Sequence, residues 1–452
     1  MEWTDKRVLV VGMARSGVAA AELLLENGAI PLINDTKAAD TFGVELDALK
    51  NTKAEFHLGE NPVTLIAKAD KVIISPGVPV DAPLVTAARK MNVPLIGELE
   101  LGALFDKSKM VAITGTNGKT TTTTLLCEIF KNAGRIARTA GNIGIPYTRV
   151  AMEAKEEDVT VCEVSSFQLE TIETFHPKVA AVLNITEDHL NRHGTMKEYI
   201  RLKMRVFENQ TEQDIAVLNF DDAALQDKAA NIKSRVMWFS RKGVVPMGAF
   251  IEDGCIMCAM GGETRKVVEI EQVRIPGPHN LENALAATCV ATAMGVPAPV
   301  IRHTLRTFEG VEHRIEFVRV IDEITFINDS KGTNVDSTIK AVQTMQTSTA
   351  IILGGYDKHS DFAPLAEEIV KAPAIEIAVL IGETAKQIKA ALEEKGFRNI
   401  LCADSMESAI ALARASLSGT GNVLLSPACA SFDMFKDYEA RGRAFKEIVM
   451  RL

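Results

Sequence analysis

The chain has 452 residues, of which 47% are hydrophobic and 24% are charged. This composition excludes a disordered or collagen-like chain, and at roughly 100–200 residues per domain the length predicts about three domains. With 50 basic and 59 acidic residues the net charge is −9. An acidic chain is not expected to bind nucleic acid or an anionic membrane surface, although a local basic pocket for phosphates is compatible with this balance.

Neither a targeting segment nor a membrane span is expected. Residues 1–7 lack the basic-then-apolar order of a signal peptide, and no apolar run approaches the ~20 residues that a bilayer requires. We therefore expect a cytoplasmic protein, in which its seven cysteines are buried free thiols rather than disulfides. The Cys255/Cys258 pair has no second ligand pair at metal spacing, so zinc is not expected.

The first part of the chain predicts a parallel sheet. An apolar strand at 7–11 leads through a glycine turn into a helix over 19–26 and a second strand at 30–33. This succession is the βαβ unit of a parallel sheet. A further strand is predicted at 72–74.

Two further α/β blocks follow. The second has predicted strands at 110–113, 159–162, 179–183 and 215–218, a β-rich patch at about 243–275 and a closing helix that starts near Asn280. The third has predicted strands at 325–328, 350–353, 377–381 and 422–425. We therefore predict an α/β protein with a Rossmann-like domain at 1–98, a central P-loop-type ATPase domain with a parallel sheet at 99–310, and a Rossmann-like α/β domain at 311–452.

The strongest local motif is a glycine loop between the predicted strand at 110–113 and a helix over 121–131. Its residues are Gly115, Thr116, Asn117, Gly118, Lys119, Thr120 and Thr121. A strand, a glycine loop and a helix are the context of a phosphate loop, in which Lys119 reaches the β/γ-phosphates of ATP and the Thr120 hydroxyl ligates Mg²⁺. The spacing is a variant, because alanine stands at 112 where the first glycine of the usual form belongs. A turn that only requires glycine is the alternative.

A second glycine turn at 12–17 resembles a dinucleotide fingerprint. Ala14 replaces its middle glycine, which leaves less room for a pyrophosphate, and Asp35 ends the next strand where an acid can bind a ribose hydroxyl. An NAD site, a different nucleotide-like ligand and a purely structural turn all remain open.

Polar side chains also follow the strands next to the phosphate loop. Glu163 follows the strand at 159–162, and His189 lies shortly after the strand at 179–183. Because carboxyl ends of parallel strands share one edge, these residues are a candidate metal pair beside the phosphates. Mg²⁺ prefers oxygen ligands, so a histidine with a purely structural role at the strand end is the alternative for His189.

Seven motifs follow one another in the order of the Mur ligase family, which the chain resembles over essentially its whole length. They occupy residues 115–121, 163–170, 184–190, 278–283, 313–316, 328–334 and 426–433. Within the family, the chain is most similar to the members that add D-glutamate. The resemblance implies that ATP phosphorylates the carboxylate of UDP-N-acetylmuramoyl-L-alanine, and that the amine of D-glutamate then attacks the acyl phosphate, in the cytoplasmic stage of peptidoglycan synthesis. We expect the chain to act as a monomer.

The resemblance also implies roles for the ATP and metal ligands. Thr120 and Glu163 would share one Mg²⁺, and His189 would serve a second. Lys203 matches a lysine that is carbamylated in the family, whereas from the residues alone it is read as a solvated helix charge. The residues implied in catalysis are Lys119, Glu163, His189 and Lys203. The residues implied at ATP outside the loop are Asn280 and Asn283 for adenine, Arg314 for phosphate and Asp329 for ribose.

Two further residue sets follow from the resemblance. The UDP-substrate is expected at Arg15, Ser16, Asp35, Thr36, Lys37, Gly77, Asn142 and Ser165, of which the last two match positions near the acyl phosphate. D-Glutamate is expected at Lys331, Thr333, Lys358, Ser431, Phe432 and Tyr438.

Three rival functions agree less well with the sequence. A folylpolyglutamate synthase would begin at the phosphate loop, without an α/β block before it. Sister Mur ligases add L-alanine, diaminopimelate or lysine, or a dipeptide, and the Asp-Asn-Pro-Arg signature of the diaminopimelate enzyme is absent from this sequence. A nucleotide-dependent regulator or motor would have no use for Glu163, His189 and Lys203 together.

Overall fold

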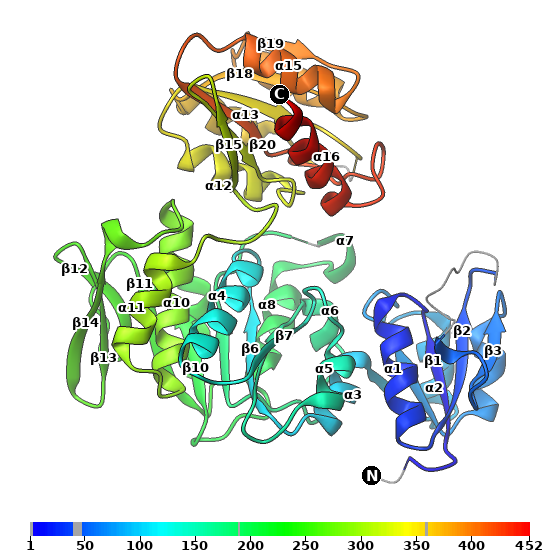
Figure 1. The fold of residues 1–452 in the computed structure, drawn as a ribbon. Helices are drawn as coiled ribbons and strands as arrows, with labels where there is room; N and C mark the ends of the chain where they lie inside the picture. Colours follow the sequence, from blue (N-terminus) through cyan, green and yellow to red (C-terminus); the bar gives the residue numbers. More distant parts are fainter. Residues whose placement is uncertain (1–2, 39–47, 189, 358–359) are drawn as a thin grey trace. The chain divides into compact units, whose positions relative to one another are not determined.

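The computed structural model describes residues 3–38, 48–188, 190–357 and 360–452, and Figure 1 draws its fold. The chain is an α/β protein with three mainly parallel sheets, one in each predicted block, so the predicted fold class is confirmed. Its residues divide into two compact units, Met1–Val273 with Leu281–Phe308 and Arg274–Asn280 with Glu309–Leu452. The three domain ranges stay a prediction, because the first two fall largely within one unit.

The first sheet has five parallel strands in the order β3-β2-β1-β4-β5. They are β1 Arg7–Val11, β2 Ile30–Asp35, β3 Glu55–Leu58, β4 Lys71–Ile74 and β5 Leu95–Gly97. The helices are α1 Arg15–Glu26, η3 Pro62–Lys68, α2 Pro83–Lys90 and α3 Glu98–Phe105. The chain crosses from one side of β1 to the other before β4. The carboxyl ends of β1 and β4 therefore form a switch point, where such sheets bind ligands.

The second sheet has nine strands in the order β14-β13-β12-β11-β10-β9-β6-β8-β7. They are β6 Lys109–Thr114, β7 Ala137–Gly141, β8 Val159–Glu163, β9 Val179–Val182, β10 Ile215–Asn219, β11 Arg235–Ser240, β12 Gly248–Glu252, β13 Cys255–Met260 and β14 Glu263–Glu269. The pairs β12/β13 and β13/β14 are antiparallel, and these three strands account for the predicted β-rich patch.

The helical segments that follow the strands of the second sheet are short apart from two. They are α4 Lys119–Asn132, α5 Tyr147–Glu153, α6 Ser166–Leu169, α7 Leu190–His193, α8 Met196–Met204, η4 Arg205–Phe207, α9 Ala223–Ala229, η5 Ile270–Gln272, α10 Pro278–Ala293 and α11 Ala298–Thr307. No helix in the described ranges is long and apolar enough to cross a membrane.

The third sheet has the order β15-β16-β20-β17-β18-β19, with β15 antiparallel to β16 and the other pairs parallel. Its strands are β15 Glu316–Ile321, β16 Ile324–Asn328, β17 Thr349–Leu353, β18 Ile375–Leu380, β19 Ile400–Cys402 and β20 Gly421–Leu425. Its helices are α12 Val335–Thr344, α13 Ala363–Lys371, α14 Ala385–Glu394, α15 Met406–Ala415 and α16 Tyr438–Arg451.

Helix α4, which follows the phosphate loop, is stabilised by packing rather than by local propensity. It begins with Lys119 and a run of threonines at 120–124, and threonine has a weak helix propensity. Leu125, Leu126, Ile129 and Phe130 are fully buried along it. The helix begins two residues before its predicted start because Gly118 adopts the left-handed conformation and lets the chain turn sharply.

Candidate active site

The phosphate loop joins β6 to α4 and depends on glycine at one position in particular. Gly118 has φ +85°, and a Cβ atom there would lie 2.2 Å from Oδ1 of Asn283. The loop is also tied to the chain after β9, because the Asn117 N–H donates to Asn184 Oδ1 at 2.8 Å and the Thr186 N–H donates to Thr116 Oγ1 at 3.0 Å. Glycine is therefore required by both conformation and space.

Two lysines converge on a single carbonyl group of this loop. Lys119 Nζ donates to the carbonyl oxygen of Gly115 at 2.9 Å and to that of Thr116 at 2.7 Å. Lys203 Nζ, from α8, donates to the same Gly115 oxygen at 2.8 Å. Two lysine amines are therefore concentrated at the loop that is expected to bind phosphates.

Lys203 is buried, which corrects the residue-based reading of it as a solvated helix charge. Its side chain is 2% exposed, and Nζ lies 4.6 Å from the centre of the Tyr199 ring. Burial, and then the nearby charge of Lys119, hold the pKa of Lys203 well below its ordinary value, while Asp188 and Glu163 act in the opposite direction. The amine is therefore far easier to deprotonate than an exposed lysine.

Glu163 ends β8 beside Asn142, which follows β7. Asn142 Nδ2 donates to Glu163 Oε1 at 2.8 Å. The other carboxylate oxygen, Oε2, is buried and has no hydrogen-bond partner among the described residues. A buried carboxylate oxygen without a partner is costly unless a cation or a donor binds it, so the site fits a metal ion. Thr120 is also buried, at the start of α4.

Ser165 follows Glu163 and caps α6. Its N–H and its hydroxyl both donate to Gln168 Oε1 at 2.9 Å, and the Gln168 N–H donates back to Ser165 Oγ at 3.3 Å. This capping box fixes the segment that leaves the carboxyl end of β8. His189 lies outside the described residues.

The turns at the carboxyl edge of the first sheet are bonded to one another. Asp35 accepts hydrogen bonds from the Met13 N–H at 2.8 Å and from the Lys37 N–H at 3.0 Å. Ser75 Oγ donates to the Gly12 carbonyl oxygen at 2.8 Å. The structure thus brings together three of the predicted UDP-substrate segments. Some of the predicted UDP-substrate residues at this edge are exposed, namely Arg15, Thr36, Lys37 and Gly77. Ser16 is half-buried.

Asp329 lies at the carboxyl end of β16 in the second unit. It accepts from Ser426 Oγ at 2.6 Å and from the Ile315 N–H at 3.2 Å. Burial raises the pKa of Asp329 to about 6, although the charge of Arg314 opposes the shift. Nε of Arg314 is buried and has no hydrogen-bond partner among the described residues. Two residues predicted to contact nucleotide therefore lie close enough to interact.

The predicted D-glutamate residues gather on the loops after β16 and β20. Lys331 Nζ lies 5.5 Å from the centre of the Tyr438 ring. Ser431 Oγ is buried and lacks a partner among the described residues, whereas Phe432 is 65% exposed and packs edge-on against Tyr356. Thr333 is half-buried, and Lys358 lies outside the described residues.

The two predicted adenine residues belong to different units, so each is described by itself. Asn280 Nδ2 donates to the Pro276 carbonyl oxygen at 2.7 Å. Asn283 Oδ1 accepts from Thr122 Oγ1 at 3.3 Å and lies against Gly118 of the phosphate loop. That both residues contact one adenine stays a prediction.

Sequence reasoning missed a buried arginine that joins the two D-glutamate loops. Arg441, on α16, is 1% exposed. Its guanidinium donates to the hydroxyl and carbonyl oxygens of Ser330 at 3.0 and 2.8 Å, and to the carbonyl oxygens of Cys429 and Ala430 at 3.0 and 3.1 Å. The available signal was its spacing of four residues from Phe445, on the buried face of the helix.

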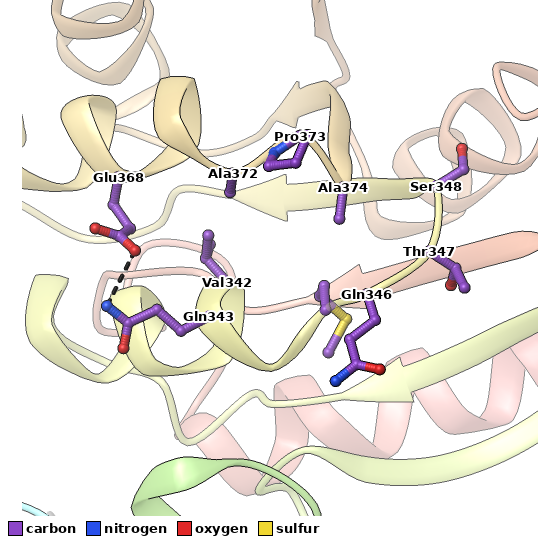
Figure 2. A pocket seen from close by; sticks show the side chains of 10 residues that line it. Val342, Gln343, Gln346, Thr347, Ser348, Glu368, Ala372, Pro373 and Ala374 are labelled. Atoms are coloured by element: carbon purple, nitrogen blue, oxygen red, sulfur yellow. Dashed lines mark hydrogen bonds between the residues drawn. The ribbon is translucent and has the colours of Figure 1, made fainter.

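A groove of about 470 Å³ lies in the same unit but on the opposite edge of the sheet (Figure 2). It is lined by the ends of α12 and α13 and by the residues before β17 and β18, including Gln343, Thr347, Glu368 and Pro373. None of the predicted site residues lines it, because they follow the carboxyl ends of the strands.

Comparison with known proteins finds the same family along the whole chain. Residues 6–97 match the Mur ligase MurD-like N-terminal domain, residues 113–291 the Mur ligase middle domain, and residues 313–429 the Mur ligase glutamate ligase domain. Proteins named UDP-N-acetylmuramoylalanine--D-glutamate ligase are 46% identical in Thermoanaerobacter sp. (strain X514) and 43% identical in Alkaliphilus oremlandii (strain OhILAs). In both cases the alignment covers 100% of each chain.

Solved structures share the fold at lower identity. UDP-N-acetylmuramate-alanine ligase MurC from Thermotoga maritima is 19% identical with a TM-score of 0.62, covering 99% of each chain. MurF ligase from the same organism, in complex with ADP, is 20% identical with a TM-score of 0.60, covering 99% of this chain and 96% of that one.

Proposed function

The chain belongs to the Mur ligase family, and we propose that it is the ATP-dependent amide ligase that joins D-glutamate to UDP-N-acetylmuramoyl-L-alanine. Relatives that carry this activity in their names are similar to the chain from end to end. The observation that carries the proposal is the convergence of Lys119 and Lys203 on the Gly115 carbonyl group, close to Glu163. A nucleotide switch has no need of this second, buried lysine.

The first chemical step makes the substrate carboxylate reactive. A carboxylate is a poor electrophile, and transfer of the γ-phosphoryl group of ATP gives it a good leaving group. Lys119 would swing from its loop carbonyls onto the β/γ-phosphates, where its charge offsets the negative charge of the transferring group. The backbone N–H groups at the start of α4 bind the same phosphates.

Mg²⁺ fits this site through Glu163 and Thr120. The unpartnered Oε2 of Glu163 offers an anionic oxygen, and the buried Thr120 hydroxyl lies at the start of α4, where P-loop proteins bind the metal. When bound, Mg²⁺ neutralises phosphate charge during the transfer. His189 would serve a second ion.

Lys203 supports the same site best as a carbamate. An ammonium at this position would repel bound Mg²⁺, whereas a carbamate carries the opposite charge and two oxygen donors. Carbamate formation requires the neutral amine, and the burial that lowers the pKa of Lys203 makes that form accessible. The same burial shields the product from water.

The second step joins the amine of D-glutamate to the activated carboxyl group. Lys331, and Lys358 from the resemblance, would hold the two acceptor carboxylates, and the unpartnered hydroxyl of Ser431 can donate to one of them. The amine attacks the acyl phosphate, a tetrahedral intermediate forms and phosphate leaves. Asn142 and Ser165 would lie near the reacting carboxyl group.

The first sheet would hold the UDP end of the substrate at its switch point, through Ser16, Asp35 and Gly77. The three turns that carry these residues already bond to one another. We further propose that the enzyme acts as a monomer in the cytoplasm.

A coupled assay tests the proposal. Purified protein is incubated with ATP and Mg²⁺, alone and with UDP-N-acetylmuramoyl-L-alanine, D-glutamate or both. We expect phosphate release together with the amide product, detected by mass spectrometry, only when UDP-N-acetylmuramoyl-L-alanine and D-glutamate are both present. Equal phosphate release without them, and no amide, would contradict ligase activity.

A further inference from the structure

Arg192 is a half-buried charged residue for which neither the predicted function nor the resemblance provides a role. It lies on α7, after β9, and its side chain is 17% exposed. Its Nη2 lies 2.6 Å and its Nε 3.3 Å from the two carboxylate oxygens of Glu170, which is itself 6% exposed. A two-point ion pair of this kind, largely removed from water, is stronger than an exposed pair.

The same guanidinium reaches the first sheet. Nη2 donates to the Val78 carbonyl oxygen at 3.2 Å and Nη1 lies 3.5 Å from that of Gly77. These carbonyls belong to the turn after β4, where the UDP end of the substrate is expected. A Cβ atom at Gly77 would meet nothing within 4 Å, so the tip of the turn is open, whereas its start is bonded to the first sheet through Ser75. Arg192 adds a contact to the tip from outside the sheet.

The neighbours of Arg192 fix its orientation. The guanidinium carbon lies 4.4 Å from the centre of the Phe167 ring, which is within cation–π distance. His193 lies 3.5 Å from Glu170 and 2.9 Å from Ser166, and it stacks on Tyr199 at 5.4 Å. Phe167, Ser166 and Glu170 belong to the segment that starts at Ser165.

We infer that Arg192 is a positioning residue, which holds the UDP-binding turn after β4 against the segment after β8 that meets the reacting end of the same substrate. This inference rests on the proposed function. One substrate molecule must place its UDP end on the first sheet and its carboxylate beside the phosphate loop. A fixed spacing between the two segments aligns that carboxylate before reaction.

The geometry favours positioning over direct substrate binding. A guanidinium has five N–H donors, and four are directed at Glu170, Val78 and Gly77. The one remaining N–H donor cannot form the pair of parallel hydrogen bonds by which arginine usually binds a phosphate group.

The test compares Arg192→Ala and Arg192→Lys with Arg201→Ala. Arg201 is a matched control, because it makes the same two-point pair with Glu198, at 2.8 and 2.7 Å, on the exposed face of α8. For Arg192→Ala we expect the KM for the UDP-substrate to rise about ten-fold or more, with the KM values for ATP and D-glutamate changed by less than about two-fold. Arg192→Lys should recover only part of the loss, because lysine keeps the positive charge but cannot form the two-point pair that the guanidinium makes with Glu170.

Calorimetry with UDP alone separates positioning from direct contact. UDP occupies only one of the two segments that Arg192 joins, so we expect the UDP affinity of Arg192→Ala to change by less than about two-fold while its KM for the whole substrate rises. A UDP affinity that falls by the same factor as the KM rises would make Arg192 a direct UDP ligand and overturn the inference. So would wild-type kinetics or equal increases in all three KM values.

Two further readouts keep the failure modes apart. If Arg192→Ala does not fold, as judged by thermal unfolding, Glu170→Gln frees the same guanidinium and should raise the same KM. Failure of the wild-type enzyme to ligate would contradict the proposed function, whereas a wild-type ligase whose variants behave normally would contradict only the role of Arg192.

Discussion

The first and second sheets each carry a strand, a glycine turn and a helix, and the two turns differ in what fills them. After β1, the turn at 12–17 is closed by the Asp35 carboxylate, which accepts from the Met13 N–H. After β6, the loop at 115–119 is filled by two lysines bonded to its own Gly115 carbonyl oxygen. One turn carries a carboxylate and the other the amines of two lysines.

Under the proposed function, this difference would distinguish a turn that holds a diphosphate from a loop that transfers a phosphoryl group. The carboxylate of Asp35 stabilises the turn itself, and Gly17 lets α1 approach so closely that a Cβ atom would lie 1.9 Å from the Gly12 carbonyl oxygen. Such a turn supplies shape and backbone donors. The second loop adds the charge of Lys119, which a transfer of the phosphoryl group would require as negative charge builds up. Under the proposed function, a similar fold would support binding in one sheet and chemistry in the next.

The largest effect is expected from removing the charge of the second loop. Lys119→Ala should lower kcat/KM by about 10³-fold or more, because the charge expected to offset the transferring phosphoryl group is lost. Steady-state kinetics at saturating ATP measures the loss. Lys131→Ala, an exposed lysine at the other end of α4, is the matched control and should stay near wild type. Near-wild-type turnover of Lys119→Ala would refute the phosphate-loop assignment.

Lys203 should be nearly as important for activity as Lys119. A small carboxylate added to the solution should restore part of the activity that its removal costs. We expect Lys203→Ala to fall by about 10³-fold and to regain part of its activity with added acetate, which can occupy the vacated carboxylate position. Lys203→Arg should not respond, because its fixed positive charge fills the site. Full activity of Lys203→Ala in CO₂-depleted buffer would mean that the carbamate has no role.

The third sheet extends the comparison to a loop that recognises an amino acid. If Lys331 holds a carboxylate of the acceptor, D-alanine should react at least about 100-fold more slowly than D-glutamate, because it lacks the second carboxylate that Lys331 and Lys358 would hold between them. Competition between the two amino acids, followed by mass spectrometry, measures the ratio. Equal rates would refute the acceptor pocket.

The fold was predictable where strands are apolar and continuous. The predicted strand at 7–11 coincides with β1, and those at 110–113 and 325–328 differ from β6 and β16 by one residue or less at each end. The strands that were not predicted are β3, β5, β7, β11, β15 and β19. Of these, β3 and β15 are half-exposed, and β15 places Phe317 on the surface, so neither has a continuous apolar signal.

The candidate site was predictable where its chemistry is local. The phosphate loop is one continuous segment, so its glycines and Lys119 identify it. Lys203 is buried through a contact with Gly115, 88 residues earlier, and only the family resemblance singled it out. Arg192 and Arg441 bond to residues more than 100 positions away, and in one sequence such residues look like surface charges. Long-range burial is what the single sequence lacks.

The smallest effect, and the sharpest test of the contrast between the two turns, is expected at Asp35. Asp35→Ala removes the acceptor for the Met13 and Lys37 N–H groups, so the turn after β1 loosens. We expect the KM for the UDP-substrate to rise about ten-fold with the KM for ATP unchanged. Asp35→Asn keeps one acceptor oxygen, so we expect its KM for the UDP-substrate to rise only about three-fold. Kinetics with each substrate varied in turn measures both. A fall in kcat at saturating substrates, with both KM values unchanged, would mean that the first turn takes part in the chemistry, and the division between a holding turn and a transferring loop would then be wrong.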